Sequence, residues 1–275
     1  SGLARFLWIV SCVCVSLGLS AAANATVTVI ETDGSLGSAE MINGQANVYT
    51  IEENLGTLVG GAAGAGGNLF HSFHRFDIAV GDTALFTASS TPANVISRVT
   101  GGFASLLDGS FESEIAGADF YFLNPAGVVI GSQGVFDLPG SLFLSSAAGL
   151  VFEDGVFDSS SQETPFVSSS PGVECCGGGP TALSFELGPR GDIEFNGGTR
   201  RWKDGSIVQV VGADIRLLAG TKMIVPGGEI HLAAVGQAAV DVPLAFIADA
   251  DLMGNGSGGG TVELRGSMGA NRTTT

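Results

Sequence analysis

Short apolar runs joined by tight turns fill the segment 118–146, ADFYFLNPAGVVIGSQGVFDLPGSLFLSS. The turns fall at 124–127, 131–134 and 139–140. In the first turn Asn124 can bond nearby backbone, Pro125 fixes φ at about −65°, and Gly127 accepts a positive φ. Almost no charged residue interrupts the segment. The pattern predicts short strands with a buried face, packed closely as in a coiled or barrelled sheet.

The same pattern returns near the C-terminus. Apolar runs at 207–211, 215–218, 223–225 and 230–235 are separated by glycines at 205, 212, 220 and 227. Gly205 and Gly227 are 22 residues apart and bracket three strand-and-turn units. That length suits one rung of a three-sided parallel β-helix, in which each rung stacks on the last. A β-sandwich is the alternative, but its turns usually come every 8–12 residues or so.

Composition supports an all-β, loop-rich protein. The chain has 43 glycines in 275 residues, and charged residues make up 14% of it. Average usage is about 7% glycine and about 25% charged residues. With 27 acidic and 11 basic residues, the net charge is −16. Nucleic acid and anionic lipid are therefore not expected as partners, because both require clustered positive charge.

The N-terminus predicts export. Arg5 precedes an apolar run at 6–19, and Ala23 and Ala25 form an A-x-A cleavage site ahead of Thr26. We interpret residues 1–25 as a secretory signal peptide. A transmembrane anchor is less favoured, because the run is shorter than the ~20 residues that span a bilayer. A lipoprotein site at Cys12 is also less favoured, because apolar sequence continues beyond it. The terminal residues leave open whether the chain is a fragment.

Cys175 and Cys176 are neighbours in a glycine-rich loop, PGVECCGGGP. Adjacent Cα atoms lie about 3.8 Å apart, below the usual disulfide range. A vicinal disulfide, two thiols and an incidental loop feature all stay open, and we favour the last.

Other candidate chemistry is weak, so we predict no catalytic, metal or cofactor site. His71 and His74 would point to opposite faces of a strand, which argues against a metal pair. Four aspartates could in principle supply the carboxylates of a glycoside hydrolase, but no spacing assembles them. They are Asp77, Asp82, Asp119 and Asp137. The chain has no G-x-S-x-G motif, P-loop or G-G-x-G-x-D calcium repeat.

Four ordered segments resemble a known family. They are GGNLFHSFHRFDI at 66–78, VISRVTGG at 95–102, GADFYFLNPAGVVIG at 117–131 and SLFLSSA at 141–147. Together they closely resemble the N-terminal secretion domain of filamentous haemagglutinin-like exoproteins, also called the haemagglutination activity domain. The residues taken as matching the family motif are Asn68, Phe70, His71, Ser72, Phe73, Phe76, Ser97, Arg98, Val99, Thr100, Gly101 and Gly102.

The resemblance implies a right-handed, single-stranded parallel β-helix of the pectate-lyase type, with an N-terminal cap and small extra-helical sheets. It also implies two-partner secretion from a Gram-negative bacterium. The general secretory machinery would act first, and a dedicated outer-membrane β-barrel transporter would follow. Asn124, Pro125 and Gly127 match the family's N-P-N-G turn, with Ala126 in place of the second Asn. The N-P-N-L motif has no literal copy, and 96–99 is its nearest candidate.

The expected organisation has five parts. These are a signal peptide at 1–25, the secretion domain core at 26–150, a loop-rich insertion at 151–189, further rungs at 190–247 and a glycine-rich tail at 248–275. We expect a secreted or cell-surface exoprotein without enzyme activity. Its downstream role would be adhesion, haemolysis or contact-dependent inhibition, with a host or neighbouring-cell surface as a further partner. The alternatives are a surface carbohydrate-binding module and a β-helical polysaccharide lyase.

Overall fold

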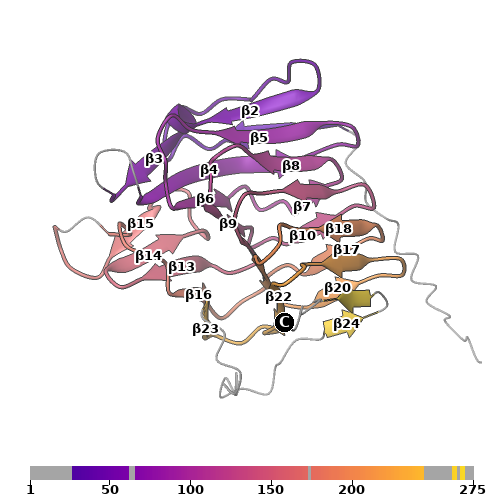
Figure 1. Ribbon diagram of the computed structural model, residues 1–275. Helices are drawn as coiled ribbons and strands as arrows, with labels where there is room; N and C mark the ends of the chain where they lie inside the picture. Colours follow the sequence, from indigo (N-terminus) through magenta and orange to yellow (C-terminus); the bar gives the residue numbers. More distant parts are fainter. Residues whose placement is uncertain (1–26, 62–65, 173–174, 245–261, 265–266, 270–275) are drawn as a thin grey trace, which may run out of the picture.

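The structure is a computed structural model that describes residues 27–61, 66–172, 175–244, 262–264 and 267–269 (Figure 1). Its strands are β1 (Val29–Thr32), β2 (Val48–Glu52), β3 (Gly56–Val59), β4 (Asn68–Asp77), β5 (Thr83–Thr87), β6 (Asn94–Val99), β7 (Ser105–Leu107), β8 (Ser110–Ser113), β9 (Asp119–Leu123), β10 (Val128–Ile130), β11 (Val135–Asp137), β12 (Leu142–Ser145), β13 (Gly149–Phe152), β14 (Gly155–Asp158), β15 (Phe166–Ser168), β16 (Ala182–Phe185), β17 (Ile193–Phe195), β18 (Thr199–Arg201), β19 (Ile207–Gly212), β20 (Ile215–Leu217), β21 (Lys222–Ile224), β22 (Glu229–Ala234), β23 (Val240–Pro243), β24 (Val262–Leu264) and β25 (Ser267–Gly269). In the described part of the chain, the one helical element is the 3-10 turn η1 (Glu53–Leu55). The all-β prediction is confirmed.

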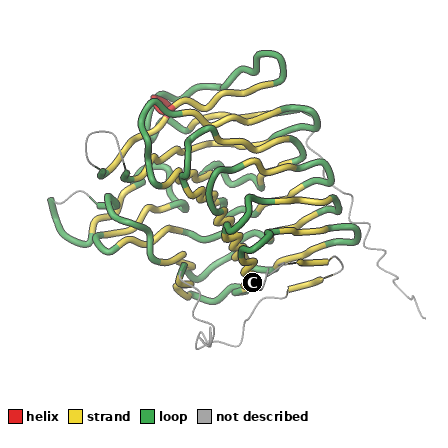
Figure 2. The backbone as a smooth tube through the Cα atoms, viewed as in Figure 1, coloured by secondary structure: helices red, strands yellow, loops and turns green. Residues whose placement is uncertain are grey.

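The strands wind into a parallel β-helix whose rungs stack along one axis (Figure 2). The long face has the order β1-β4-β6-β9-β12-β19-β22, and the second face runs β7-β10-β17-β20-β24. The third face consists of β2-β5-β8-β11, followed by the separate sheet β18-β21-β25. One rung therefore contributes one strand to each face, as β9, β10 and β11 do.

The register confirms the rung length expected from the glycine spacing. Phe120 on β9 pairs with Leu142 on β12, and Val208 on β19 pairs with Ile230 on β22. Both pairs are 22 residues apart in sequence. The predicted runs at 207–235 form β19 to β22, with ends that differ by about one residue. Parallel pairing between successive rungs excludes the β-sandwich.

The inside of the coil is an apolar core. On the long face, Leu69, Val95, Phe120, Leu142 and Val208 are paired in register and are all buried. The Phe120 ring packs 4.8 Å from that of Phe86 and 4.9 Å from that of Phe111, which joins the long face to the third face. Because strand side chains alternate, every second residue of each strand adds to this column.

The first rung is capped. β1 and β3 both lie antiparallel along β4, while β2 extends the third face by pairing in parallel with β5. Thr28, just before β1, accepts the backbone N–H of Ala79 at its hydroxyl and donates to Asp82 at 2.5 Å. An uncovered first rung would present a row of unpaired backbone groups, and the cap covers much of that edge.

A second sheet lies outside the coil, with β13 to β16 inserted between β12 and β17 and β23 added after β22. It is antiparallel, has the order β15-β14-β13-β16-β23, and lies beside the long face (Figure 1). A second apolar core fills the contact between them. It includes Phe70, Ile96, Tyr121 and Phe143 from the outer side of the long face, and Leu150, Phe152, Phe157, Leu183 and Phe185 from the outlying sheet. The segment 151–189, expected to be rich in loops, thus contains β14, β15 and β16.

Two of the expectations fall largely outside the described residues. The signal peptide, with Ala23 and Ala25, lies wholly outside them, as does most of the tail at 248–275. Two short strands of that tail are described, and β24 pairs in parallel with β20 while β25 pairs with β21. No helix in the described ranges is both long and apolar enough to cross a membrane.

Candidate functional site

The 124–127 turn connects β9 to β10 at one corner of the coil, and neighbouring turns contact it on both sides. Its own closure is a hydrogen bond from the Gly127 N–H to the Asn124 carbonyl, 2.8 Å long. The Gly127 carbonyl accepts from the N–H of Ser105 on the preceding rung, and the Pro125 carbonyl accepts from the N–H of Gly191 on the next one. The turn is therefore also a contact between three rungs.

The Asn124 side chain is completely buried and holds this corner together. Its amide nitrogen donates to the carbonyl oxygen of Phe103 and to the hydroxyl of Ser105, both at 3.0 Å. Its amide oxygen accepts the N–H of Ala126 at 2.9 Å, which makes an Asx turn. An apolar residue at position 124 would remove all three hydrogen bonds. The groups that bonded to Asn124 would then be left without this partner, which lowers the free energy of unfolding.

Gly127 is required by both conformation and space. Its φ is +102°, and a Cβ there would lie 2.7 Å from the carbonyl oxygen of Asp192. Ala126, where the family turn has Asn, is half-buried and contributes its N–H to the Asx turn through the backbone. The three residues assigned to the turn from sequence therefore act as one structural unit.

The family-matching residues on β4 divide between the two sides of the long face. Phe73 and Phe76 belong to the core inside the coil, and the buried His71 ring packs 5.5 Å from Phe86 of that core. Phe70 instead packs against the outlying sheet, with its ring 4.6 Å from that of Phe157. Because these side chains are buried, the motif shapes the fold more than it shapes a surface.

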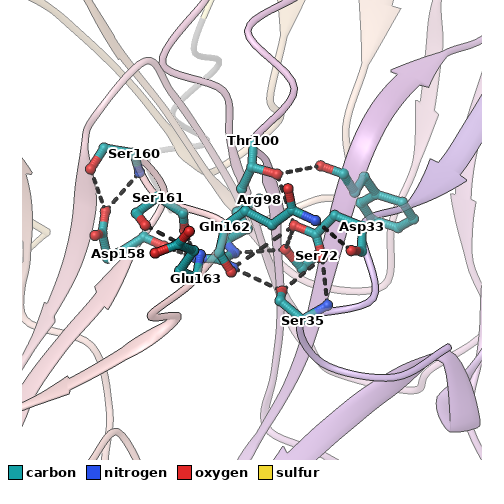
Figure 3. A network of polar contacts seen from close by, with 11 residues as sticks. Asp33, Ser35, Ser72, Arg98, Thr100, Asp158, Ser160, Ser161, Gln162 and Glu163 are labelled. Carbon is teal, nitrogen blue, oxygen red and sulfur yellow. Dashed lines mark hydrogen bonds and ion pairs between the residues drawn. The ribbon is translucent and has the colours of Figure 1, made fainter. Parts of the chain in front are cut away.

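Arg98, on β6, is fully buried and lies at the centre of a polar network (Figure 3). Its Nε donates to the hydroxyl of Ser72 at 2.7 Å, and its Nη2 donates to the hydroxyl of Ser35 at 2.9 Å. Carbonyl oxygens at the end of β14 and in the loop after it accept from the same guanidinium; they belong to Asp158, Ser161 and Gln162. Arg98 therefore joins the N-terminal cap, the coil and the outlying sheet.

Asp33 supplies the negative charge of this network. Its carboxylate lies 3.9 Å from the Arg98 guanidinium and accepts hydrogen bonds from Ser72 at 2.6 Å and Thr100 at 2.8 Å. Burial alone would raise the pKa of Asp33, but hydrogen bonds from Ser72, Ser35 and Thr100 outweigh it and lower the pKa. The Gln162 side chain also donates to the Asp33 carbonyl at 2.6 Å, across 129 residues of sequence.

His71 is a buried neutral histidine, and His74 lies on the other side of the strand against Phe103. Burial lowers the pKa of His71 to about 4, opposed by the nearby backbone of Leu55 and the charge of Glu53. The two histidines thus do not form a pair. No cluster of metal-ligating side chains occurs among the described residues.

Gly101 and Gly102 let the chain turn tightly after β6. A Cβ on Gly101 would collide with the carbonyl oxygen of His74, while Gly102 has a φ of +75°. The turn places Phe103 on the surface, where the residue is 51% exposed. The Arg75 guanidinium stacks 5.4 Å from the centre of that ring. Arg75 and Phe103 were not singled out from the sequence, because no motif marks them as partners.

Cys175 and Cys176 are joined by a disulfide, and both are buried in the second core. The Cys176 carbonyl accepts from the side chain of Asn68 at 2.7 Å, and its N–H donates to Asp154 at 2.8 Å. The pair thus links the loop after β15 to the start of β4. The sequence favours an incidental loop feature, but the two cysteines form a buried disulfide with contacts to other parts of the chain. The sequence does not show this, because these contacts arise only in the folded chain.

Three of the four candidate aspartates have separate structural partners. Asp77 accepts from Arg75 and from the N–H of Leu106, and Asp82 accepts from Thr28. Asp119 accepts from the N–H of Ser141, and Asp137 lies exposed at the end of β11. Each of the first three is thus engaged with a different partner in the fold.

Comparison with known families agrees with the capped coil and its turn. The model of the TPS secretion domain family matches residues 29–242. The chain belongs to this family. The match runs from β1 into β23, and so covers the cap, the coil and the outlying sheet. No curated protein matches the chain.

TPS secretion domains are the N-terminal domains of two-partner secretion exoproteins, and they are not a family of enzymes. Such exoproteins cross the outer membrane through a transporter that forms the second partner. Membership in the TPS family confirms the resemblance seen in the sequence. It also agrees with a fold built from stacked rungs.

Proposed function

We propose that this chain is the export-directing part of a secreted exoprotein, and that an outer-membrane β-barrel transporter recognises it. The observation that carries the proposal is the match of the TPS family to residues 29–242, which contain the cap and most of the coil. The general secretory machinery would deliver the chain to the periplasm with the signal peptide at 1–25. The protein then acts outside the cell or on its surface.

The coil suits folding during export, because its rungs follow one another in sequence. β9 pairs with β6, and β12 then pairs with β9, so each rung docks on one that precedes it. A chain that emerges N-terminus first can therefore fold in order, with the capped first rung as the nucleus. Interactions between neighbours supply most of the stability of such an array.

Burial on each new rung favours outward movement. The inward Leu142 and Leu144 of β12 are each almost completely buried, and burying such a side chain contributes roughly 1.5–3 kcal/mol gross. Ordering of the backbone and side chains offsets much of this gain. The remainder, repeated rung by rung, biases the chain against sliding back and needs no nucleotide hydrolysis.

In this proposal the 124–127 turn sets the corner that makes the following rungs stack correctly. Asn124 ties the turn to Phe103 and Ser105, and Gly127 fits it against Asp192. A displaced corner would shift Val128 in the register of β10 with β7, and so turn apolar side chains to the wrong face. Adhesion to a host or neighbouring-cell surface is the downstream role that we favour.

The test is secretion of the full chain in cells that do or do not express the cognate transporter. We expect the wild-type protein in the culture supernatant only when the transporter is present. Asn124→Ile should be made and should cross the inner membrane, yet be lost from the supernatant and degraded in the periplasm. It removes the buried amide, and its β-branching resists the turn geometry.

Ala126→Asn is the matched control in the same turn, since it restores the residue of the family motif, and we expect it to be secreted nearly normally. Immunoblots of supernatant and periplasm measure both variants. Secretion without any transporter would overturn the proposed function. Normal secretion of Asn124→Ile would overturn the role given to the turn and leave the transporter dependence intact.

A further inference from the structure

An exposed aromatic–cation pair lies beside the 124–127 turn. Phe103 is 51% exposed, and among the exposed large apolar side chains of the described residues it is the one aromatic. Arg75 stacks on its ring at 5.4 Å, and the His74 ring lies 6.1 Å away on the edge. We name His74, Arg75 and Phe103 the Phe103 patch. Aromatic and arginine side chains are the residues that most often dominate binding energy at protein interfaces.

The Phe103 patch is held rigidly from below. The Phe103 carbonyl accepts from the buried amide of Asn124 at 3.0 Å. The Arg75 Nε donates to the buried Asp77 carboxylate at 2.6 Å, and Asp77 in turn accepts the N–H of Leu106. Close packing of Gly101 on His74 fixes the loop between them. A surface ordered in advance loses little entropy on binding, which favours affinity.

The chemistry of the patch also defines what it can bind. Among the described residues, the Arg75 guanidinium hydrogen-bonds through Nε alone, and the Arg75 side chain is 42% exposed, so its two terminal nitrogens are available to a partner. Those two nitrogens match the geometry of a carboxylate. The whole chain is strongly acidic, with a net charge of −16. Other parts of its surface would therefore repel an acidic partner, and Arg75 would orient that partner on the Phe103 patch.

We propose that the Phe103 patch is the docking surface for the transporter's periplasmic domains. Those domains would offer an apolar pocket for the Phe103 ring, with a carboxylate at its rim for Arg75. This inference rests on the proposed function. The patch needs only the rungs that contain β4, β6 and β9 together with Asn124, residues 68–124, so it can form before the later rungs do. It is therefore available early in export.

The test measures binding of the purified, full mature chain to the isolated periplasmic domains of the cognate transporter. Phe103→Ala should weaken binding at least about 10-fold, and Arg75→Gln should weaken it by a similar factor. The double variant should bind little worse than either single one, since the two side chains act together. Phe103→Tyr keeps the ring and should bind within about 3-fold of wild type.

Leu187→Ala is the matched control, because Leu187 is 81% exposed and lies just after β16 of the outlying sheet. It should leave binding unchanged. Thermal unfolding should give nearly the same midpoint for Phe103→Ala, Leu187→Ala and wild type, which separates lost contact from lost fold.

The two levels of the proposal fail differently. If wild type binds the periplasmic domains and Phe103→Ala binds equally well, the Phe103 patch is not the docking surface, while the transporter remains the partner. If Leu187→Ala weakens binding as much as Phe103→Ala, the contact is not specific to the patch, and the inference fails. If wild type does not bind those domains at all, docking through the patch is overturned; secretion that still depends on the transporter would then preserve the proposed function.

Discussion

Arg98 allows a direct test of how the three parts of the fold are held together. Arg98→Met keeps an unbranched side chain of similar length and removes the charge. The change leaves the buried Asp33 carboxylate without its cation, although the hydroxyls of Ser72 and Thr100 still donate to it. The carbonyl oxygens of Asp158, at the end of β14, and of Ser161, in the loop after it, also lose their donor.

Removing one partner of a buried ion pair typically costs about 3–5 kcal/mol, because the other charge stays buried. We expect the free energy of unfolding of Arg98→Met to fall by an amount in that range, which is a large part of a typical total of about 5–15 kcal/mol. With a urea m-value of about 3 kcal/mol/M, the unfolding midpoint would fall by roughly 1–1.7 M. Asp33→Asn, added to Arg98→Met, should cost less than the sum of the two single changes.

The assay is urea unfolding of the mature chain, followed by far-UV circular dichroism and by the fluorescence of the buried Trp202. Arg201→Met is the control, because Arg201 is 59% exposed and pairs with the exposed Asp204. Such a surface pair contributes only about 0–1 kcal/mol. If Arg98→Met stayed within about 1 kcal/mol of wild type, the buried network would not be what joins cap, coil and outlying sheet.

Two further predictions concern the same region. Burial lowers the pKa of His71 to about 4, so the unfolded chain binds a proton more readily than the folded one. The free energy of unfolding should therefore be highest above pH ~6.5 and fall by about 3 kcal/mol as the pH drops to 4. Thermal scans across that range should show a shallower dependence for His71→Leu, and an equal dependence would exclude His71 as the cause. Gly101→Ala should destabilise by at least about 2 kcal/mol, because its Cβ meets the His74 carbonyl. Gly102→Ala, which meets no neighbour, should cost only the ~1–2 kcal/mol of a positive φ; equal losses in a calorimetric comparison would refute the steric argument.

The stacked coil could be predicted from the sequence, because its contacts are short-range and periodic. Glycines at 205, 212, 220 and 227 mark turns of a rung whose strands pair 22 residues apart, as Val208 and Ile230 do. The turn at Asn124, Pro125 and Gly127 was also recognisable, since each residue type has a local conformational reason to be there. In a solenoid, local pattern and tertiary contact are largely the same information.

The tertiary structure alone decided how the coil is joined to its surroundings. Arg98 meets Ser35 across 63 residues, and Gln162 meets the Asp33 carbonyl across 129 residues. No repeat or turn motif relates such positions, so a buried arginine in VISRVTGG could not be assigned its partners beforehand. The family resemblance implied small extra-helical sheets, but the sequence did not locate the strands of the outlying sheet, because they are only three or four residues long and contain serine and glycine. Local periodicity specifies the rungs, whereas burial of the outer face of the long sheet, visible only once the chain is folded, selects what packs against it.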